Sequence, residues 1–287
     1  MAELRIGSIR QWYNKHAALM PGTLFVVATP IGNLDDITLR ALRILRDVAV
    51  IAAEDTRRTA HLLARHGIRT PTTSLHEHNE SKKTAAIVSR LLAGDDVALV
   101  SDAGTPTVSD PGLSCIRAAI DADVRVEPIP GPNAAIAALS ASGMAADSFT
   151  FLGFPPTRSN DRNMWFARLK SCRGTAVFYE APHRIRRTLG DLTKFIGDRP
   201  VVLAREMTKI HEQLVKGPIS TVLSQLKSER GEFTVVVEVG ETTNYDQLSL
   251  VEPSSGETSR RATVTAAAKS LGVSANALYA AVEQLRK

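Results

Sequence analysis

The stretch with the most distinctive chemistry is residues 97–112, which read VALVSDAGTPTVSDPG. A run of strand-forming residues leads into a loop that contains Asp102 and Asp110, two glycines and two prolines, and that has no Lys or Arg. Phosphate-binding loops use backbone N–H groups and often a lysine, whereas two carboxylates would repel a pyrophosphate. The loop therefore favours a neutral or cationic ligand. A surface turn followed by a capped helix is the simpler alternative.

Two other loops of the same kind follow strand-like runs. They read ATPIGNLDDIT (28–38) and PIPGPNAA (128–135). In open α/β sheets, ligands bind beyond the carboxyl ends of the strands. Neither GxxxxGK[ST] nor a GxGxxG after a strand occurs in the chain. Three Pro/Gly loops at one edge of a sheet favour a ligand site that is not built for nucleotide phosphates.

The elements that would position these loops alternate along the chain. Strands are expected at residues 23–29, 48–53, 97–102, 125–130, 149–154, 175–180, 201–206 and 233–239. Helices are expected at residues 37–48, 109–122, 132–142, 161–171, 183–197 and 219–228. Ser109 is a plausible cap of its helix, with Pro111 in the first turn. Continuous β-branched runs that alternate with helices predict α/β layers with buried sheets.

Composition indicates what class of protein this is and where the boundaries of its segments lie. The 287 residues carry a net charge of +5, which raises the odds of a polyanionic partner. The distant Cys115 and Cys172 indicate free thiols in a reducing cytoplasm, and no signal peptide or membrane span is expected. The expected segments are a weakly structured extension at 1–20, α/β domains at 21–130 and 131–243, a linker at 244–257, and a helix-turn-helix-like tail at 258–287, with Ser274 or Asn276 as a cap.

Several long motifs, in order, resemble a known family. They are VATPIGNLDDIT (27–38), AEDTRRT (53–59), HEHNE (76–80), SDAGTPTVSDPG (101–112), PIPGPNAAIAAL (128–139), FLGFPP (151–156) and FYEAPHR (178–184). Together they resemble the tetrapyrrole methylase superfamily, and within it the ribosomal RNA small-subunit methyltransferase I family, over about residues 23–240. The resemblance implies two α/β domains with a cofactor cleft between them, and 2′-O-methylation of a decoding-centre cytidine of 16S rRNA with S-adenosylmethionine.

The resemblance also implies which residues contact the cofactor. S-adenosylmethionine is a sulfonium cation without a phosphate, so an acidic loop is compatible with it. By motif position the expected contacts are Pro30, Ser101, Asp102, Ala103, Thr107, Pro130, Asn133, Tyr179, Glu180, Ala204 and Phe233. Porphyrin-modifying relatives have a GxGPG-like first loop and a GDP triplet in the second, where this chain reads ATPIGN and SDAGTP. This departure points away from a tetrapyrrole substrate.

Methyl transfer to a ribose hydroxyl needs alignment of donor and acceptor and removal of the hydroxyl proton. Candidate bases lie in three polar clusters: Glu54, Asp55, His76, His78 and Lys209. Each cluster has a structural alternative. Asp55 and Arg57 could form an ion pair that caps the next helix, the histidines could lie in a solvated loop, and 205–213 could be a charged loop. No metal-ligand set is evident, because two histidines at i and i+2 have no nearby partner.

RNA contact is expected from a basic block at 154–187 and from the tail. The residues predicted to bind RNA are Arg57, Arg158, Arg162, Arg184, Arg186, Arg187, Arg260 and Arg261. Trp165 and Phe166 could stack on bases, but core positions on an amphipathic helix are favoured for them. The expected partner is 16S rRNA, in an assembled 30S subunit, with the protein as a cytoplasmic homodimer by family resemblance.

Two other functions remain open at this stage. One is a tetrapyrrole methyltransferase on the same fold, which ATPIGN, EDTR and the basic block disfavour. The other is a non-catalytic rRNA- or DNA-binding factor that has lost its cofactor, which three intact strand-end loops disfavour. Cofactor binding and the acceptor that receives the methyl group would separate the three.

Overall fold

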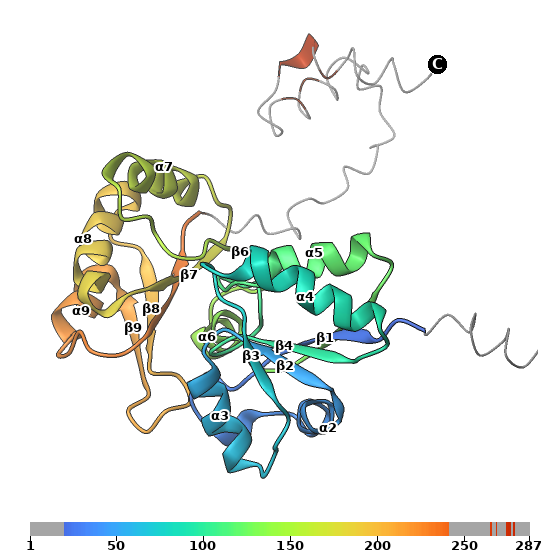
Figure 1. Ribbon diagram of the computed structural model, residues 1–287. Coiled ribbons are helices and arrows are strands. Elements are labelled where there is room, and N and C mark those ends of the chain that lie inside the picture. Colours follow the sequence, from blue (N-terminus) through green and yellow to red (C-terminus); the bar gives the residue numbers. More distant parts are fainter. Residues whose placement is uncertain (1–19, 241–264, 266–267, 269–273, 277, 279–287) are drawn as a thin grey trace, which may run out of the picture. The chain divides into compact units, whose positions relative to one another are not determined.

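The computed structural model describes residues 20–240 and, beyond them, residues 265, 268, 274–276 and 278 (Figure 1). Contacts divide the chain into two compact units, 1–242 and 243–287. The predicted N-terminal extension up to residue 19, the linker and most of the predicted tail, with Arg260 and Arg261, lie outside the described residues. In the second unit the Leu278 N–H donates to the Ser274 carbonyl at 3.1 Å, and Ser274 directly precedes helical residues.

The first half of the larger unit contains a parallel sheet in the order β3-β2-β4-β1-β5. Its strands are β1 (Thr23–Val27), β2 (Val50–Ala53), β3 (Thr72–Ser74), β4 (Val97–Val100) and β5 (Arg125–Ile129). The helical elements between them are η1 (Leu34–Asp36), α2 (Leu39–Asp47), α3 (Thr56–Arg65), α4 (Glu80–Leu92) and α5 (Leu113–Asp121). Because the strands are parallel, their carboxyl ends meet at one edge.

Helices cover both faces of this sheet. Along β4, Ala98 and Val100 pack with the apolar residues of α2 and α3, while Val97 and Leu99 pack with those of α4 and α5. Figure 1 shows the two helix pairs on opposite sides of the strands. A strand buried on both faces has no polar alternation, which explains the continuous apolar runs in the sequence.

The second half contains a mixed sheet in the order β6-β7-β10-β8-β9, in which only β6 and β7 pair in parallel. Its strands are β6 (Phe149–Phe151), β7 (Thr175–Glu180), β8 (Pro200–Arg205), β9 (Gln213–Pro218) and β10 (Phe233–Glu238). The helical elements are α6 (Ala134–Ser142), α7 (Ser159–Lys170), η2 (Pro182–Arg184), α8 (Ile185–Ile196) and α9 (Ile219–Gln225). The predicted α/β layers are thus confirmed in both halves.

The helices of the second half also divide between two faces. α7, α8 and α9 pack on one face of the sheet, and α6 packs on the other through Ala135, Ala138 and Leu139. Trp165 and Phe166 of α7 are 8% and 1% exposed, so the core positions favoured for them are confirmed. α6 therefore buries its apolar face against the second sheet, although it directly follows the last strand of the first.

Several local expectations were wrong. The strands β3 and β9 and the helix α4 were not predicted, a helix at α3 entered only as the alternative for Asp55, and α5 begins at Leu113 instead of residue 109. Ser109 has a φ of 69° and is no cap; instead, Glu80 of α4 accepts the N–H groups of Gly112 and Ser114 at 3.2 and 2.9 Å. A carboxylate from another helix thus satisfies free donors at the start of α5.

Other expectations concern cysteines and membranes. Cys115 and Cys172 are free thiols, as predicted. Within residues 20–240 and the few described positions beyond, no helix has the length and apolar character needed to cross a bilayer.

Candidate functional site

The carboxyl edge of the first sheet is where the three loops meet. Thr29, after β1, and Gly104, after β4, exchange backbone hydrogen bonds of 2.9 and 3.0 Å. The Thr29 hydroxyl also donates to the Ser101 carbonyl at 3.2 Å. The loops 28–38 and 101–112 therefore form one connected surface, as their positions after neighbouring parallel strands predicted.

Carboxylates join the β2 loop to the same surface. Glu54 Oε2 accepts the Asp102 N–H at 3.1 Å, and Asp102 Oδ1 accepts the Asp55 N–H at 2.9 Å. Arg58 lies 3.5 Å from Asp102 Oδ2. This reciprocal pair of side-chain-to-backbone bonds fixes the ends of β2 and β4 against each other and orients the carboxyls.

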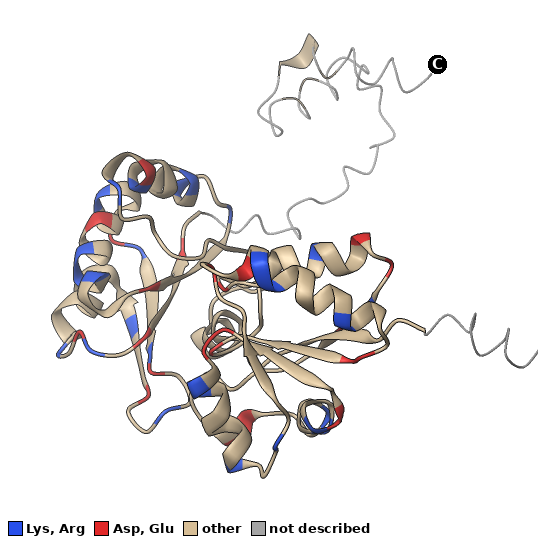
Figure 2. Cartoon of the chain, viewed as in Figure 1, with Lys and Arg blue, Asp and Glu red and all other residues tan. Residues whose placement is uncertain are grey.

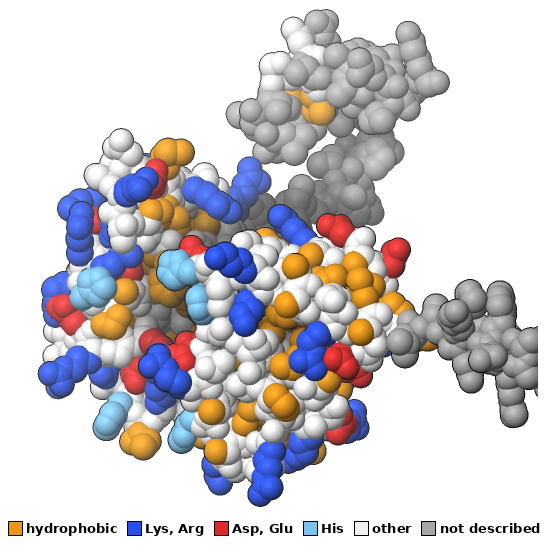
Figure 3. All heavy atoms as spheres, viewed as in Figure 1, with side chains coloured by type: hydrophobic (Ala, Val, Ile, Leu, Met, Phe, Trp, Pro, Cys, Tyr) orange, Lys and Arg blue, Asp and Glu red, His pale blue; other side chains and the backbone are white. Residues whose placement is uncertain are grey.

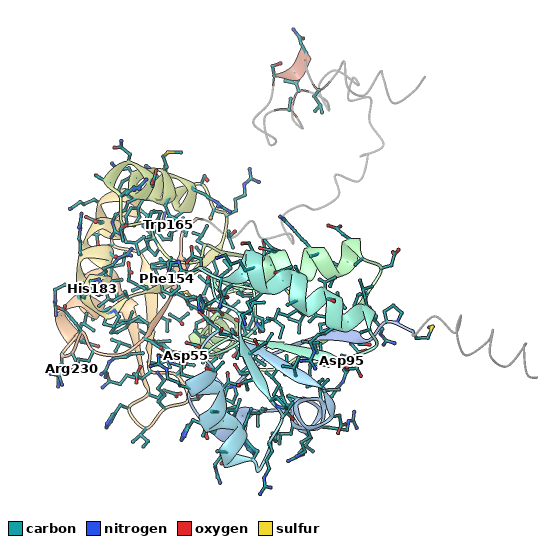
Figure 4. All side chains as sticks on the ribbon, in the orientation of Figure 1. Asp55, Asp95, Phe154, Trp165, His183 and Arg230 are labelled. Atoms are coloured by element: carbon teal, nitrogen blue, oxygen red, sulfur yellow. The ribbon has the colours of Figure 1, made fainter. Side chains whose placement is uncertain are left out.

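These loops form one wall of a cavity of about 400 Å³, which we call the acidic cavity. Five carboxylate residues and a single arginine line it, and the other wall comes from the second half, including Phe154 and Tyr179. Figure 4 shows Phe154 on the second half and Asp55 at the facing end of β2. The carboxylate residues of the lining are Glu54, Asp102, Asp110, Glu180 and Glu232. The cavity thus suits a cation, as the loop composition predicted.

Crowded carboxyls in this cavity hold protons more tightly than usual. Burial, and then the negative charge of Glu54, raise the pKa of Asp110 to about 7, against a hydrogen bond from Ser101. Burial also raises the pKa of Glu54, and the hydrogen bond from Asp102 opposes this. Two interacting carboxyls titrate as a unit. Asp110, beside Glu54, can therefore accept or release a proton near neutral pH.

The opposite wall combines aromatic rings with a helix start. The Tyr179 hydroxyl accepts the Ala135 N–H at 3.2 Å, and the Phe154 ring lies 5.5 Å from that of Tyr179. Asn133 caps α6 by accepting the N–H groups of Ala135 and Ile136. Phe154 is 49% exposed, so a planar group in the cavity would meet an available aromatic face.

A buried ion-pair network supports this wall from behind. The Glu180 side chain is 0% exposed, and it accepts hydrogen bonds from Thr188 and from the Ala181 N–H. Arg184 lies 3.1 Å from Glu180 and also donates to the Pro155 carbonyl. Through Arg184, the network fixes the loop that carries Phe154.

A second hollow, of about 600 Å³, adjoins the acidic cavity, and we call it the arginine hollow. Both share Ile31, Arg58, Asp102, Ala103 and Glu232 as lining residues. Its remaining wall includes Arg57 and His61 of α3 and Lys209 of the hairpin between β8 and β9. Figure 3 shows Lys, Arg and His side chains gathered around the hollowed face between the two halves.

The hairpin reaches from the second sheet to the first. The Asn33 N–H donates to the Thr208 hydroxyl at 2.9 Å. Lys209 Nζ pairs with Glu206 at 3.0 Å and with Glu232 at 2.9 Å. Burial lowers the pKa of Lys209, but the bonds to Glu232 and Glu206 outweigh this and raise it overall. Lys209 is therefore a stable cation at the rim.

The predicted cofactor residues fall into three groups. Six line the acidic cavity: Asp102, Ala103, Asn133, Tyr179, Glu180 and Phe233. Pro30 and Ser101 line the arginine hollow. Thr107, Pro130 and Ala204 line neither hollow, and Ala204 is fully buried. Thr107 belongs to the loop 101–112 and Pro130 to the loop 128–135, and other residues of both loops line the acidic cavity.

The candidate bases also separate. Glu54 lines the acidic cavity, and Asp55 and Lys209 line the arginine hollow. Asp55 caps α3 through the Arg57 N–H at 2.8 Å and pairs with the Arg57 guanidinium, so the capping alternative is confirmed. These bonds lower the pKa of Asp55 and make it a poor base.

His76 and His78 lie outside both hollows. Their rings are 6.0 Å apart in an edge-on arrangement, and His76 contacts Asn79 at 3.0 Å. In the described part of the chain they belong to no cluster of three or more potential metal ligands. The structure thus does not bring them to the acidic cavity.

The residues predicted to bind RNA are unequally available. Arg162 is 5% exposed and bonds to Thr188 and Asp191, so it serves the fold and cannot reach RNA. Arg184 is tied to Glu180, and Arg186 donates to Glu229 and to backbone carbonyls of α9 and the residue after it. Arg57, Arg158 and Arg187 are exposed. Figure 2 shows Lys and Arg along α7 and α8 and at both ends of α3.

Sequence reasoning missed several lining residues. Asp110 stood in the quoted acidic loop and Phe154 in FLGFPP, yet neither was assigned a role. A second carboxylate eight residues after Asp102 was the available signal for Asp110. Met207 and Glu232 come from the second half and carried no local signal.

Comparison with known proteins agrees with this geometry. A family profile described as Tetrapyrrole (Corrin/Porphyrin) Methylases matches residues 23–223. The chain belongs to the tetrapyrrole methylase family. The chain is 44% identical to a protein of Pseudomonas aeruginosa over 90% of this chain and 95% of that protein. It is 48% identical to a protein of Xylella fastidiosa over 76% of this chain and 82% of that protein.

Both relatives are named Ribosomal RNA small subunit methyltransferase I, so the resemblance inferred from the motifs is confirmed. Among solved structures, the chain is similar to uroporphyrin-III C-methyltransferase from Thermus thermophilus complexed with S-adenosylhomocysteine. The TM-score is 0.54, at 16% identity over 77% of this chain and 98% of that chain. At this identity the likeness shows the fold, which confirms the predicted fold class.

Proposed function

We propose that this protein transfers a methyl group from S-adenosylmethionine to the RNA of the small ribosomal subunit. The observation that carries the proposal is the identity of 44% with a ribosomal RNA small subunit methyltransferase I over 90% of the chain. The acidic cavity supports it independently, because its chemistry suits a cationic cofactor and opposes a phosphate.

The residues present fit S-adenosylmethionine. A cavity of about 400 Å³ falls in the range of about 300–1,000 Å³ typical of small-molecule sites. Glu54, Asp102 and Asp110 offer carboxyl groups to a sulfonium and an ammonium group, whereas Glu180 is buried and paired with Arg184 and Glu232 is paired with Lys209. Phe154 and Tyr179 offer ring faces to an adenine. We propose Asp102, Ala103 and Asn133 as further contacts, with Pro30 and Ser101, which line the adjoining arginine hollow, next to them in the same loops.

The bound cofactor supplies an electrophilic methyl group, and the acceptor hydroxyl must lose its proton as the methyl is transferred. The Glu54–Asp110 pair lines the same cavity and holds a proton near neutral pH, so we propose it as the proton acceptor. Lys209 stays protonated and suits a phosphate contact better than proton removal. Asp55 is engaged by Arg57.

The finer assignment follows the family resemblance. We propose the ribose 2′-hydroxyl of a decoding-centre cytidine in 16S rRNA as the acceptor, in an assembled 30S subunit, with a cytoplasmic homodimer as the working form. We also propose that the α/β domains divide near residue 130, since α6 packs on the second sheet. A tetrapyrrole substrate has no comparable support, because the porphyrin-modifying structure is only 16% identical.

The test is transfer of radiolabel from S-adenosylmethionine to small subunits from a strain that lacks this protein, with the labelled nucleotide mapped by mass spectrometry. We expect label on one 16S nucleotide. Cofactor binding is measured separately by calorimetry. Binding without label on RNA would refute the RNA assignment, and absence of binding would favour a non-catalytic RNA-binding factor.

A matched pair of variants tests the proton acceptor. Asp110→Asn should lower kcat at least about 100-fold, the lower range for loss of a general base. Asp161→Asn makes the same chemical change at an exposed position on α7 and should leave kcat unchanged. Equal rates for the two variants would remove Asp110 from the mechanism.

A further inference from the structure

Helix α3 presents a row of cations beside the acidic cavity. At about 100° per residue, its basic side chains fall on one arc of about 100°, and they are Arg57, Arg58, His61 and Arg65. The buried side chains of the helix occupy the opposite arc, and they are Thr59, Leu62 and Leu63. Arg57, Arg58 and His61 line the arginine hollow, and Arg65 lines the next hollow along the surface.

The placement of this row works against helix stability. The N-terminus of a helix carries a partial positive charge, so cations in the first turn are unfavourable there. α3 has no acidic residue in its first turn, where Arg57 and Arg58 stand; Asp55 pairs with Arg57, and Asp102 lies 3.5 Å from Arg58. Arg65, further along the helix, lies 3.4 Å from Asp35. Local rules are most often broken where function requires it.

The row also presents positive charge outward. The Arg57 and Arg58 side chains are 90% and 64% exposed, while the carboxylates they pair with, Asp55 and Asp102, are 27% and 24% exposed. The carboxylates therefore lie beneath the guanidinium groups. A polyanion that approaches this surface meets the cations first.

An exposed apolar tip stands next to the row. Ile210, at the turn between β8 and β9, is 97% exposed and lies between Lys209 and His211. The turn is held firmly, because Thr208 has a φ of 65°, its N–H donates to Glu212 and its hydroxyl binds the Asn33 N–H. Ile210 and Arg65 line the same hollow. A rigidly held, fully exposed isoleucine beside cations suits contact with an unstacked base.

We propose that the RNA strand carrying the methylated nucleotide runs along α3, with its phosphates on the basic row and a base against Ile210. This deepens the proposed function and rests on it. The row leads to Arg58 and Asp102, which line both hollows, so a ribose can reach the acidic cavity while its phosphates stay outside. No residue of α7, in the basic block at 154–187, lines either hollow.

The test compares two faces with matched variants. Arg57→Gln/Arg65→Gln removes two charges from α3, and Arg168→Gln/Lys170→Gln removes two exposed charges from α7. Log affinity falls as log salt rises, and loss of two phosphate contacts to a single strand makes this slope shallower by about 1.4. At 0.1 M salt the same loss weakens RNA affinity about 25-fold. We expect this rise in KM for small subunits, and this slope change, for the α3 variant alone.

A second pair of matched variants tests the proposed contact between Ile210 and an RNA base. Ile210→Ser should raise KM for small subunits several-fold, whereas Met164→Ser, on α7 and 71% exposed, should not. Cofactor affinity by calorimetry should match the wild type in all four variants. If the wild type methylates RNA and the α7 variants show an equal or larger effect, the proposal fails while the proposed function stands. If the wild type labels no RNA, the proposed function itself fails.

Discussion

The Asp110 carboxyl gives the sharpest test of the acidic cavity. Burial and the charge of Glu54 raise its pKa from 3.8 to about 7. The negative charges that act on it come from the ends of β2 and β4, through Glu54 and Asp102, and its own charge acts on Tyr179 of β7. Asp110→Asn removes the ionisable group and keeps nearly the same shape.

The sign follows from proton binding. The unfolded chain loses the Asp110 proton near pH 3.8, whereas the folded protein keeps it up to about pH 7. Between these values the folded state binds more protons, so the free energy of unfolding of the wild type falls as pH rises and levels off above pH 7. The Asp110→Asn variant escapes this loss, and its advantage should grow over the same window.

Solvent screening reduces the stability gain expected for the Asp110→Asn variant, because Asp110 is partly exposed. The full shift corresponds to about 4 kcal/mol for a fully buried carboxyl, but Asp110 is only partly buried. We therefore expect the variant to gain about 1–2 kcal/mol at pH 8. For a unit of this size, that gain raises Tm by about 2–8 °C, whereas the two proteins should melt together near pH 4.

Thermal unfolding at pH 4, 6 and 8 makes the measurement. Asp161→Asn, at an exposed position on α7, provides the control and should show the same Tm difference from the wild type at each pH. A Tm advantage for Asp110→Asn that is equal at pH 4 and pH 8 would show that the carboxyl titrates normally. The Glu54–Asp110 pair would then lose its claim as proton acceptor.

Three further changes test other parts of the reasoning. Glu80→Ala removes the cap of α5, so urea unfolding should show a loss of about 1 kcal/mol; no loss would mean that water replaces the cap. Arg162→Ala removes the buried hydrogen bond to Thr188 and the ion pair with Asp191, while Arg184 still pairs with Glu180, so urea unfolding should show a loss of about 1–3 kcal/mol, whereas no loss would contradict the network. Gly32→Ala places a Cβ about 2.7 Å from the backbone of the β8–β9 hairpin, so methyl transfer should fall, while Gly190→Ala, with open space around it, should retain activity; equal activities would show that the hairpin can shift freely.

The sequence was a good guide to the buried strands and a poor one to edges and loop ends. β1, β4, β7 and β10 are continuous apolar runs and were found. β9, with the sequence QLVKGP, is an edge strand with Lys, Gly and Pro, residues that the strand pattern does not include. The start of α5 depends on Glu80, 32 residues earlier, and a local pattern cannot reveal such a contact.

The site shows the same division between local and distant information. The acidic character of residues 101–112 was evident from composition, and Asp102 and Ala103 do line the acidic cavity. Burial was not evident. Arg162 reads as one more cation of a basic block, yet it is enclosed by Asp191 and Glu180 from α8 and β7. Charge can be counted in a sequence, but its exposure depends on packing partners far along the chain.

The two hollows together suggest how one protein can use a cationic cofactor and a polyanionic substrate. The acidic cavity attracts a sulfonium and repels phosphate. The arginine hollow is lined by Arg57, Arg58 and Lys209 together with three carboxylates, and the guanidinium groups of Arg57 and Arg58 are more exposed than the carboxylates they pair with. Arg58 and Asp102 line both hollows and lie 3.5 Å apart. If RNA is held by its phosphates at α3, as proposed, an uncharged group such as a ribose hydroxyl is the part of the strand that the acidic cavity would admit most easily.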